Sequence, residues 1–397
     1  MPGPYSNVVE SGELRSPLIR PFMPELDTLR GIAVVAVLLL HAFFWQYAGY
    51  SFSRWSTVFL RVTSPGGYGV NLFFVLSGFL ITGILLDSKG RPYYYRRFYT
   101  RRALRILPPY YALLLLLLVL GSSSAAFVGL SFIYLSNLTN FFGVACDYGP
   151  LWSLAIEEHF YLLWPAVVRN LTRRQLAFIS GSLVALIPVF RMISFALGYK
   201  DGIGWYTWFA ADGLAAGSLL AILLRTAVTR KQLWNLCSML LFSSVLLGIV
   251  GQPFGLDTRT RLLGAGFQWT VVHFLCAGIL LFFLLLGTSS AKRYVNNSVL
   301  RFLGYISYGL YLNHLLAFRM YDRICRHYWP ELVPSNGHFG LVVLRFAIGG
   351  GCAIAVAAIS RKYFEEHFLR LKDSLVPQKA TSPADAAINA TADTQVA

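Results

Sequence analysis

The stretch LRGIAVVAVLLLHAFFW, residues 29–45, decides the fold class of this chain. It is apolar apart from Arg30 near its start and His41 near its end. His41 follows Arg30 by eleven positions, which on an α-helix is three turns plus about 20°, so both side chains share one face roughly 16 Å apart. Ionisable side chains inside a membrane-spanning helix are costly and usually functional. We interpret the stretch as a membrane-spanning helix with two candidate functional residues.

The rest of the chain repeats this apolar character. Of 397 residues, 56% are hydrophobic and only 13% charged, whereas a soluble protein has about 25% charged residues. Apolar runs of about 20 residues predict transmembrane helices. We therefore expect an all-α polytopic membrane protein with about ten transmembrane helices, at residues 28–47, 67–86, 104–121, 151–168, 175–195, 204–224, 232–251, 267–288, 302–321 and 340–360. The less apolar segment 127–142 is expected to be interfacial or re-entrant, or else an eleventh span.

Charge gives the orientation. The net charge of +16 is better explained by the positive-inside rule than by nucleic-acid binding, because the basic residues sit in short loops between spans. Both termini are then cytoplasmic, with an N-terminal segment at 1–24, a transmembrane domain at 25–372 and a disordered tail at 373–397. We expect no cleaved signal peptide. The five cysteines have no metal-ligand spacing, so no metal site is expected.

Several ionisable residues on other spans fall at a depth similar to that of His41. These residues are Glu157, Glu158, Asp212 and His314. A carboxylate beside a histidine fixes its tautomer and allows it to act as a general base, so we predict that Glu157 orients His41. The alternative is that each group makes a structural hydrogen bond between helices.

The segment 89–105 is predicted to be a loop, and Pro108 and Pro109 to lead into the third span. It holds seven Lys or Arg residues and no acid. One interpretation is topogenic charge attracted to anionic lipid. The other is a phosphate site, in which Arg101, Arg102 and Arg105 offer bidentate contacts to a polyphosphate.

The second span contains Ser77 followed by Gly78. Small residues allow a neighbouring helix to approach closely. Ser77 is also a candidate nucleophile, although no G-x-S-x-G turn surrounds it, so packing is the favoured interpretation.

Six motifs occur in the order typical of one family. They are LDTLRG (26–31) with His41, FFVLSGF (73–79), RRALRILPPYY (101–111), WSLAIEEHFY (152–161), DGLAAG (212–217) and ISYGLYLNH (306–314). Over about residues 22–372 the chain resembles the acyltransferase 3 family of bacterial membrane acyltransferases. The element YFEEHF (363–368) departs from the family pattern at Glu366-His367, where Lys-Pro is usual, so we assign it no role.

The resemblance implies transfer of an acyl group, most often acetyl from acetyl-CoA, to a hydroxyl of a cell-envelope or lipid-linked glycan. It implies an essential His41 that works with Arg30, in a protein of the bacterial cytoplasmic (inner) membrane. Acyl-CoA is then a co-substrate that docks its phosphates on Arg101, Arg102 and Arg105, and no cofactor is permanently bound. The expected partners are acyl-CoA, the carbohydrate acceptor and membrane lipids. The chain is expected to be a stand-alone form without a C-terminal extracytoplasmic hydrolase-like domain.

Three questions stay open at this point. The acceptor and the acyl chain length cannot be read from the sequence. Direct attack on the thioester and a covalent acyl-imidazole on His41 are both compatible with it. The alternative function is a transporter or flippase of a glycan or lipid-linked intermediate, with the buried His and Glu residues as a proton relay. No duplicated halves support that alternative.

Overall fold

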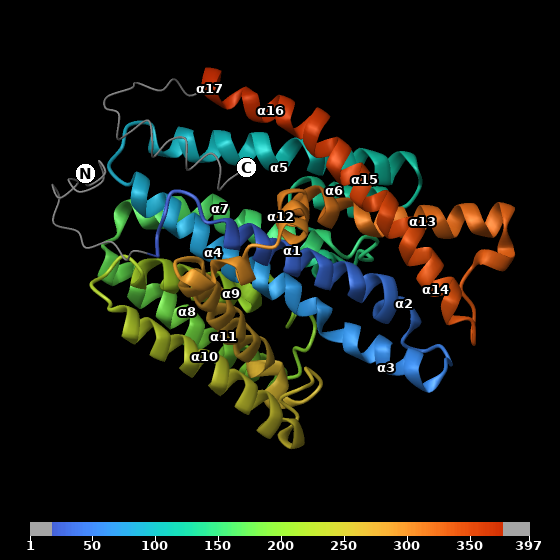
Figure 1. The fold of residues 1–397 in the computed structure, drawn as a ribbon, viewed down its shortest axis with the longest axis horizontal. Coiled ribbons are helices and arrows are strands. Elements are labelled where there is room, and N and C mark those ends of the chain that lie inside the picture. The colour runs from blue at the N-terminus through green and yellow to red at the C-terminus, as the bar shows by residue number, and fades with distance from the viewer. Residues whose placement is uncertain (1–17, 376–397) are drawn as a thin grey trace.

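The computed structural model describes residues 18–375, and every regular element in that range is helical (Figure 1). Seven helices or joined helical runs are long and apolar enough to cross a membrane. The predicted all-α polytopic membrane fold is confirmed. Of the predicted terminal segments, residues 1–17 and 376–397 lie outside the described residues.

The long helices form most of the molecule. They are α1 (Pro24–Leu39), α4 (Tyr68–Ser88), α5 (Tyr94–Val119), α7 (Leu151–Asn170), α8 (Arg173–Ala196), α9 (Thr207–Leu223), α10 (Arg230–Val250), α11 (Leu262–Gly287) and α13 (Ser307–Tyr328). The shorter helices are α2 (Trp45–Tyr47), α3 (Arg54–Thr63), α6 (Ala125–Phe132), α12 (Ser298–Tyr305), α14 (Phe339–Arg345), α15 (Gly351–Ile359), α16 (Glu366–Arg370) and α17 (Lys372–Leu375). The π-helical segments are η1 (Leu40–Phe44), η7 (Phe346–Gly350) and η8 (Ser360–Glu365). The 3₁₀ turns are η2 (Ser64–Gly67), η3 (Ser136–Phe142), η4 (Gln252–Phe254), η5 (Ser290–Val295) and η6 (Pro330–Leu332).

Each of the ten expected spans falls on one of these helices or on a joined run. The last one is a continuous run from α14 to α16. The ninth differs, because the chain breaks at Ile306 between α12 and α13. The helices α7, α9 and α13 are not among the seven that meet the length and polarity requirements for a span. Ten crossings and two cytoplasmic termini therefore stay predictions.

The predicted loop at 89–105 is wrong, because most of it belongs to α5. This helix begins at Tyr94 and continues through Pro108 and Pro109 for 26 residues. Next to the two prolines, the Tyr308 hydroxyl donates to the Ile106 carbonyl over 3.0 Å and ties this part of α5 to α13. The arginines predicted as a phosphate site are thus held on a helix.

The segment 127–142 does not form an eleventh span. It is divided between α6 and η3, and α6 has eight residues. Eight residues of α-helix measure about 12 Å, well short of the roughly 30 Å of a bilayer's hydrocarbon core. The segment instead packs on the ends of α5 and α7, where the Tyr110 hydroxyl donates to the Ser131 carbonyl and the Ser136 hydroxyl to the Leu151 carbonyl.

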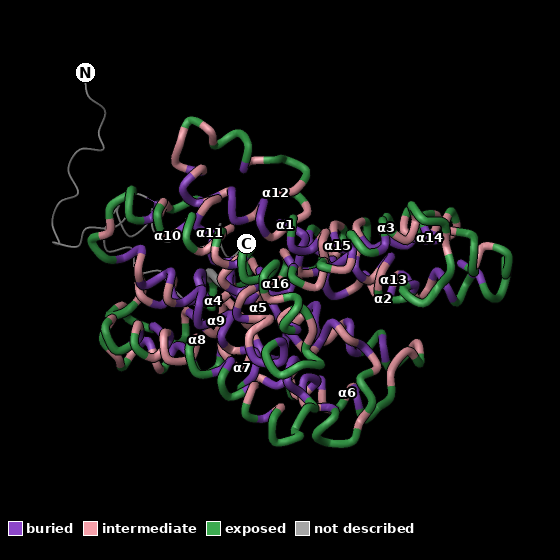
Figure 2. The backbone as a smooth tube through the Cα atoms, turned by 90° about the horizontal axis from the view of Figure 1, so that it is seen from below, coloured by how far each residue is buried: buried purple, intermediate pink, exposed green. Residues whose placement is uncertain are grey.

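The helices α1 and α4 run through the middle of the bundle, with α8, α10 and α11 on one side and α5 and the α15–α16 run on the other (Figure 1). Buried residues gather on the central helices, and exposed residues lie mostly on the periphery and in loops (Figure 2). One large apolar cluster joins residues of α1, α4, α9, α10 and α11. Helices α1 and α4 therefore lie at the centre of the bundle.

Two glycines set the crossing of α4 and α9. A Cβ on Gly78 would lie 1.9 Å from the Leu214 carbonyl oxygen, and a Cβ on Gly217 would lie 2.0 Å from that of Val75. Such small-residue contacts let helix backbones approach closely in membranes. The predicted packing role of the Ser77-Gly78 pair is confirmed for Gly78.

We predict that Gly78→Leu destabilises the protein, because its side chain must push α4 away from α9. Overpacking costs about 1–3 kcal/mol, and more where backbone must move. Thermal unfolding in detergent should show the midpoint lowered by several degrees. Gly248→Leu on α10 is the matched control, since a Cβ there meets nothing within 4 Å. Equal midpoints for the two variants would contradict the close crossing.

Candidate active site

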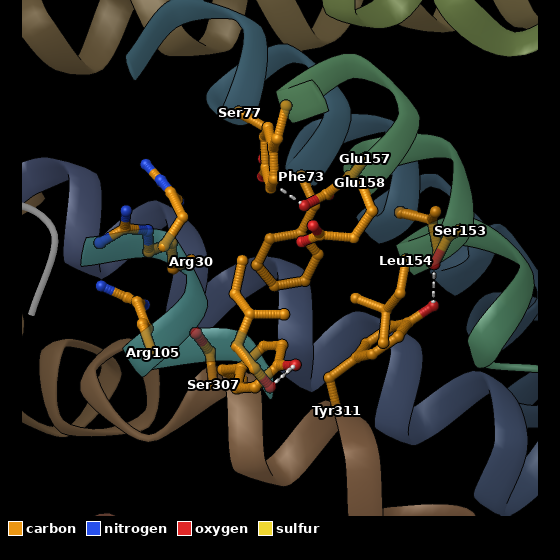
Figure 3. Close-up of a pocket in the computed structure, with 15 residues that line it drawn as sticks. Arg30, Phe73, Ser77, Arg105, Ser153, Leu154, Glu157, Glu158, Ser307 and Tyr311 are labelled. Atoms are coloured by element: carbon orange, nitrogen blue, oxygen red, sulfur yellow. Dashed lines mark hydrogen bonds between the residues drawn. The ribbon is translucent and has the colours of Figure 1, made fainter. Parts of the chain in front are cut away.

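A cavity lies inside the bundle among α1, α4, α5, α7 and α13 (Figure 3). It encloses about 720 Å³ of empty space, counting the solvent at its mouth. The break at Ile306 brings the first turn of α13 to its wall. The lining residues are Arg30, Val70, Phe73, Ser77, Arg102, Arg105, Ile106, Ser153, Leu154, Glu157, Glu158, Tyr161, Ser307, Tyr308 and Tyr311.

Three arginines form one side of this cavity. Arg30 and Arg105 lie on the side opposite Glu157 and Glu158 (Figure 3). The Arg102 guanidinium lies 5.0 Å from the centroid of the Tyr161 ring, a cation–π contact that stabilises a desolvated cation. The Nη1 atom of Arg105 is buried and has no hydrogen-bond partner among the described residues. A buried donor without a partner is unusual in a native structure, and it indicates a place for an anionic ligand.

Arg101, the third residue of the predicted phosphate site, does not line the cavity. Around α5 the lining residues Arg105, Arg102 and Ile106 fall within an arc of about 100°, and Arg101 lies about 40° outside that arc, beyond Arg105. Arg30, which sequence analysis grouped with His41, takes the third basic position in its place. It also forms an ion pair of 3.1 Å with Asp27, one turn earlier on α1.

The opposite side of the cavity carries a hydrogen-bonded group on α7 and α4. The Tyr161 hydroxyl lies 2.6 Å from Glu157 Oε2 and 3.1 Å from the Ser77 hydroxyl. Glu158, the next residue along α7, also lines the cavity. Tyr161 was missed by sequence analysis, although its position one helical turn after Glu157 is a usable signal. The Tyr161 hydroxyl therefore links Glu157 on α7 to Ser77 on α4.

His41 lies outside this cavity and is not hydrogen-bonded to Glu157 in the described structure. Its Nδ1 atom lies 3.0 Å from the Val37 carbonyl oxygen and 3.3 Å from Nε2 of His314. The expected pairing with Glu157 therefore fails, because equal depth along a bundle does not fix the direction in which a side chain points. His314, a secondary candidate in the sequence, is the contact that the structure provides.

The contacts of the two histidines determine the tautomer of each ring. His314 Nδ1 lies 2.8 Å from the Tyr311 carbonyl oxygen, and carbonyl oxygens only accept, so this nitrogen carries the proton. Its Nε2 is then an acceptor that faces Nδ1–H of His41. This assignment leaves Nε2 of His41 with a free lone pair, which is the state that a general base requires. His41 also lies in the π-helical segment η1, a feature frequent at functional sites.

Tyr311 connects the histidine pair to the cavity. It lines the cavity, its hydroxyl lies 2.6 Å from that of Ser153, and its ring centroid lies 5.9 Å from that of His314. The His41–His314 pair thus lies behind one wall of the cavity. A thin ligand held by the arginines would approach the histidines along this wall.

Comparison with known proteins supplies the family. A family model described as an acyltransferase domain matches residues 23–361. The chain belongs to this acyltransferase family. It is 30% identical to the peptidoglycan O-acetyltransferase OatA of Listeria monocytogenes over 74% of this chain and 49% of that protein. It is 27% identical to the O-acetyltransferase OatA of Staphylococcus aureus over 74% of this chain and 50% of that protein.

This acyltransferase spans about half the length of these two relatives. No solved structure matches it.

Asp212, another secondary candidate, lies in a separate buried cluster of this acyltransferase. Its carboxylate pairs with Arg191 at 2.9 Å, accepts from the Thr270 hydroxyl at 2.8 Å and lies 3.3 Å from His273 Nδ1. Asn71 Nδ2 lies 3.1 Å from the other ring nitrogen of His273. The cluster joins α4, α8, α9 and α11 and does not line the central cavity. Its contacts favour a structural role.

We predict that Asp212→Asn strongly destabilises the protein, because it leaves the guanidinium of Arg191, which is 1% exposed, without a countercharge. Breaking a buried ion pair costs about 3–5 kcal/mol. Thermal unfolding should show a large drop in the midpoint. Asp87→Asn is the control, since Asp87 pairs with Arg225 but is 30% exposed, and partly exposed pairs contribute less. An Asp212→Asn protein with wild-type stability would contradict the structural role.

Proposed function

We propose that this chain is a membrane-embedded O-acyltransferase that moves an acetyl group from acyl-CoA to a hydroxyl of a cell-envelope glycan. Membership of the acyltransferase family and the names of the two relatives support the reaction class. The observation that carries the proposal is the cavity itself, where Arg105 holds a buried donor without a partner beside Arg30 and Arg102. We place the protein in the cytoplasmic membrane of a bacterium, with the donor side toward the cytoplasm.

The three arginines suit the phosphates of CoA. Guanidinium groups bind phosphate oxygens bidentately, and three of them line this cavity. An anionic ligand would satisfy Nη1 of Arg105, which has no partner among the described residues. Since Arg30 on α1 and His41 on η1 belong to one continuous helical run, the extended pantetheine arm would follow that run toward His41.

At His41 the reaction needs one group that accepts a proton and later returns it. Nε2 of His41 takes the proton of the acceptor hydroxyl while the hydroxyl oxygen attacks the thioester carbonyl. The tetrahedral intermediate collapses, the C–S bond breaks, and the CoA thiolate takes the proton back from the imidazolium. His314 accepts from Nδ1–H and holds the ring in place, so it acts as a positioning residue. The alternative order, with an acyl-imidazole formed first, uses the same lone pair.

We predict that Arg105→Ala raises KM for acetyl-CoA about 10- to 100-fold, which corresponds to the roughly 1.5–3 kcal/mol of a hydrogen bond to a charged group. The measurement is acetyl-CoA consumption by purified protein with a glycan acceptor, at varied donor and acceptor concentrations. Arg96→Ala is the matched control, because Arg96 lies exposed on the same helix and donates to the Leu375 carbonyl.

Two results would count against the proposal. If wild-type protein does not consume acetyl-CoA with any glycan acceptor, the reaction class is wrong. If Arg105→Ala changes KM for the acceptor alone, the arginines do not bind the donor phosphates.

A further inference from the structure

A second hollow opens where α8 ends and α9 and α11 begin. It holds about 920 Å³ of empty space, open solvent included, and Lys200, Trp205, Thr258, Arg259 and Thr260 are among its lining residues. Its only charged lining residues are the two cations. None of these residues lines the central cavity. The hollow is therefore a separate site.

Trp205, which lines the hollow, belongs to a cluster of three tryptophans. The ring centroid of Trp152 on α7 lies 5.0 Å from that of Trp205 and 6.0 Å from that of Trp269. All three rings are only partly buried. Aromatic side chains with a few placed polar groups are typical of small-ligand sites.

Arg259 is the principal cation of the hollow. Its guanidinium carbon lies 5.7 Å from the centroid of the Trp205 ring and 5.2 Å from that of Trp269. A Cβ on Gly204 would lie 2.1 Å from Nη1 of Arg259, so the glycine makes room for this guanidinium. No ion pair joins Arg259 to a carboxylate among residues 18–375. The two indoles thus orient a fork of N–H donors that matches the geometry of a carboxylate or a phosphate.

This hollow adjoins the reaction path. Trp205 lines the hollow and its ring contacts that of Trp152, and the next two residues of α7, Ser153 and Leu154, line the central cavity. Ser153 contacts the Tyr311 hydroxyl, and the Tyr311 ring lies beside His314. The contact between Trp205 and Trp152 therefore connects the hollow to the side chains that lead to His41.

We propose that this hollow is the acceptor subsite and that it binds a saccharide bearing a carboxylate. The inference rests on the proposed function and specifies its acceptor. The indoles pack against the apolar C–H face of a sugar ring, Thr258 and Thr260 hydrogen-bond its hydroxyls, and Arg259 binds the carboxylate. A lipid headgroup is the less favoured ligand, because the indoles pack against one another in a wall between helices, whereas interfacial tryptophans anchor in the headgroup layer.

The test measures saccharide binding to the purified full-length chain in detergent by isothermal titration calorimetry. The probe is a tetrasaccharide of alternating glucuronic acid and N-acetylglucosamine, and its carboxyl-reduced form is the neutral control. Wild-type protein should bind the acidic probe at least ten-fold more tightly than the neutral one. Arg259→Ala should remove this preference, and Trp205→Ala should weaken binding of both probes. Arg54→Ala, an exposed arginine at the start of α3, should bind both probes as wild type does.

Acetyl-CoA binding, measured separately, should be the same in wild type, Arg259→Ala and Trp205→Ala. Equal affinities for the two probes, no binding of either, or wild-type binding by Arg259→Ala would overturn the subsite. So would loss of probe binding when phosphatidylglycerol vesicles are added at a concentration at which neutral phosphatidylcholine vesicles have no effect, because the site would then hold a lipid headgroup. Arg259-dependent binding by a protein that transfers no acetyl group would retain the subsite and reject the proposed function.

Discussion

The placement of three half-buried arginines inside a helical bundle is the constraint on which the proposed site depends. Arg30, Arg102 and Arg105 come from two helices and face one cavity. Burying cations in a membrane is costly unless countercharges and hydrogen bonds compensate. The carboxylates of Glu157 and Glu158 line the cavity, Asp27 pairs with Arg30, and the Tyr161 ring contacts Arg102. Nη1 of Arg105 stays without a partner among the described residues, and an anionic donor would supply one when it binds.

Other contacts in the bundle, outside this cavity, hold the helices around it together. Glycine contacts draw α4 against α9, and the cluster around Asp212 ties α9 to α8 and α11 through Arg191 and Thr270. Arg191 in this cluster has a countercharge in Asp212, whereas Nη1 of Arg105 at the cavity has no partner among the described residues.

Much of the fold followed from the sequence, because hydropathy and helix length are local properties. The direction of a side chain around its helix axis is not local, since it depends on how neighbouring helices pack. Glu157 and His41 have similar predicted depth, yet Glu157 contacts Tyr161 while His41 contacts His314. The start of α5 was misplaced because Pro108 and Pro109 were interpreted as a boundary, whereas the helix continues through both. The aromatic residues of the wall, Tyr311 above all, gave no signal beyond their position in a motif.

The central claim is that the free lone pair of His41 performs the proton transfer, and the turnover of a His41→Ala protein tests it most directly. General-base catalysis contributes roughly 10²- to 10⁴-fold, so kcat for acetyl transfer should fall by at least about 100-fold. Acetyl-CoA affinity and thermal stability should stay near wild type, and His327→Ala, an exposed histidine at the far end of α13, should keep full activity. Near-wild-type turnover by a folded His41→Ala protein would contradict the claim.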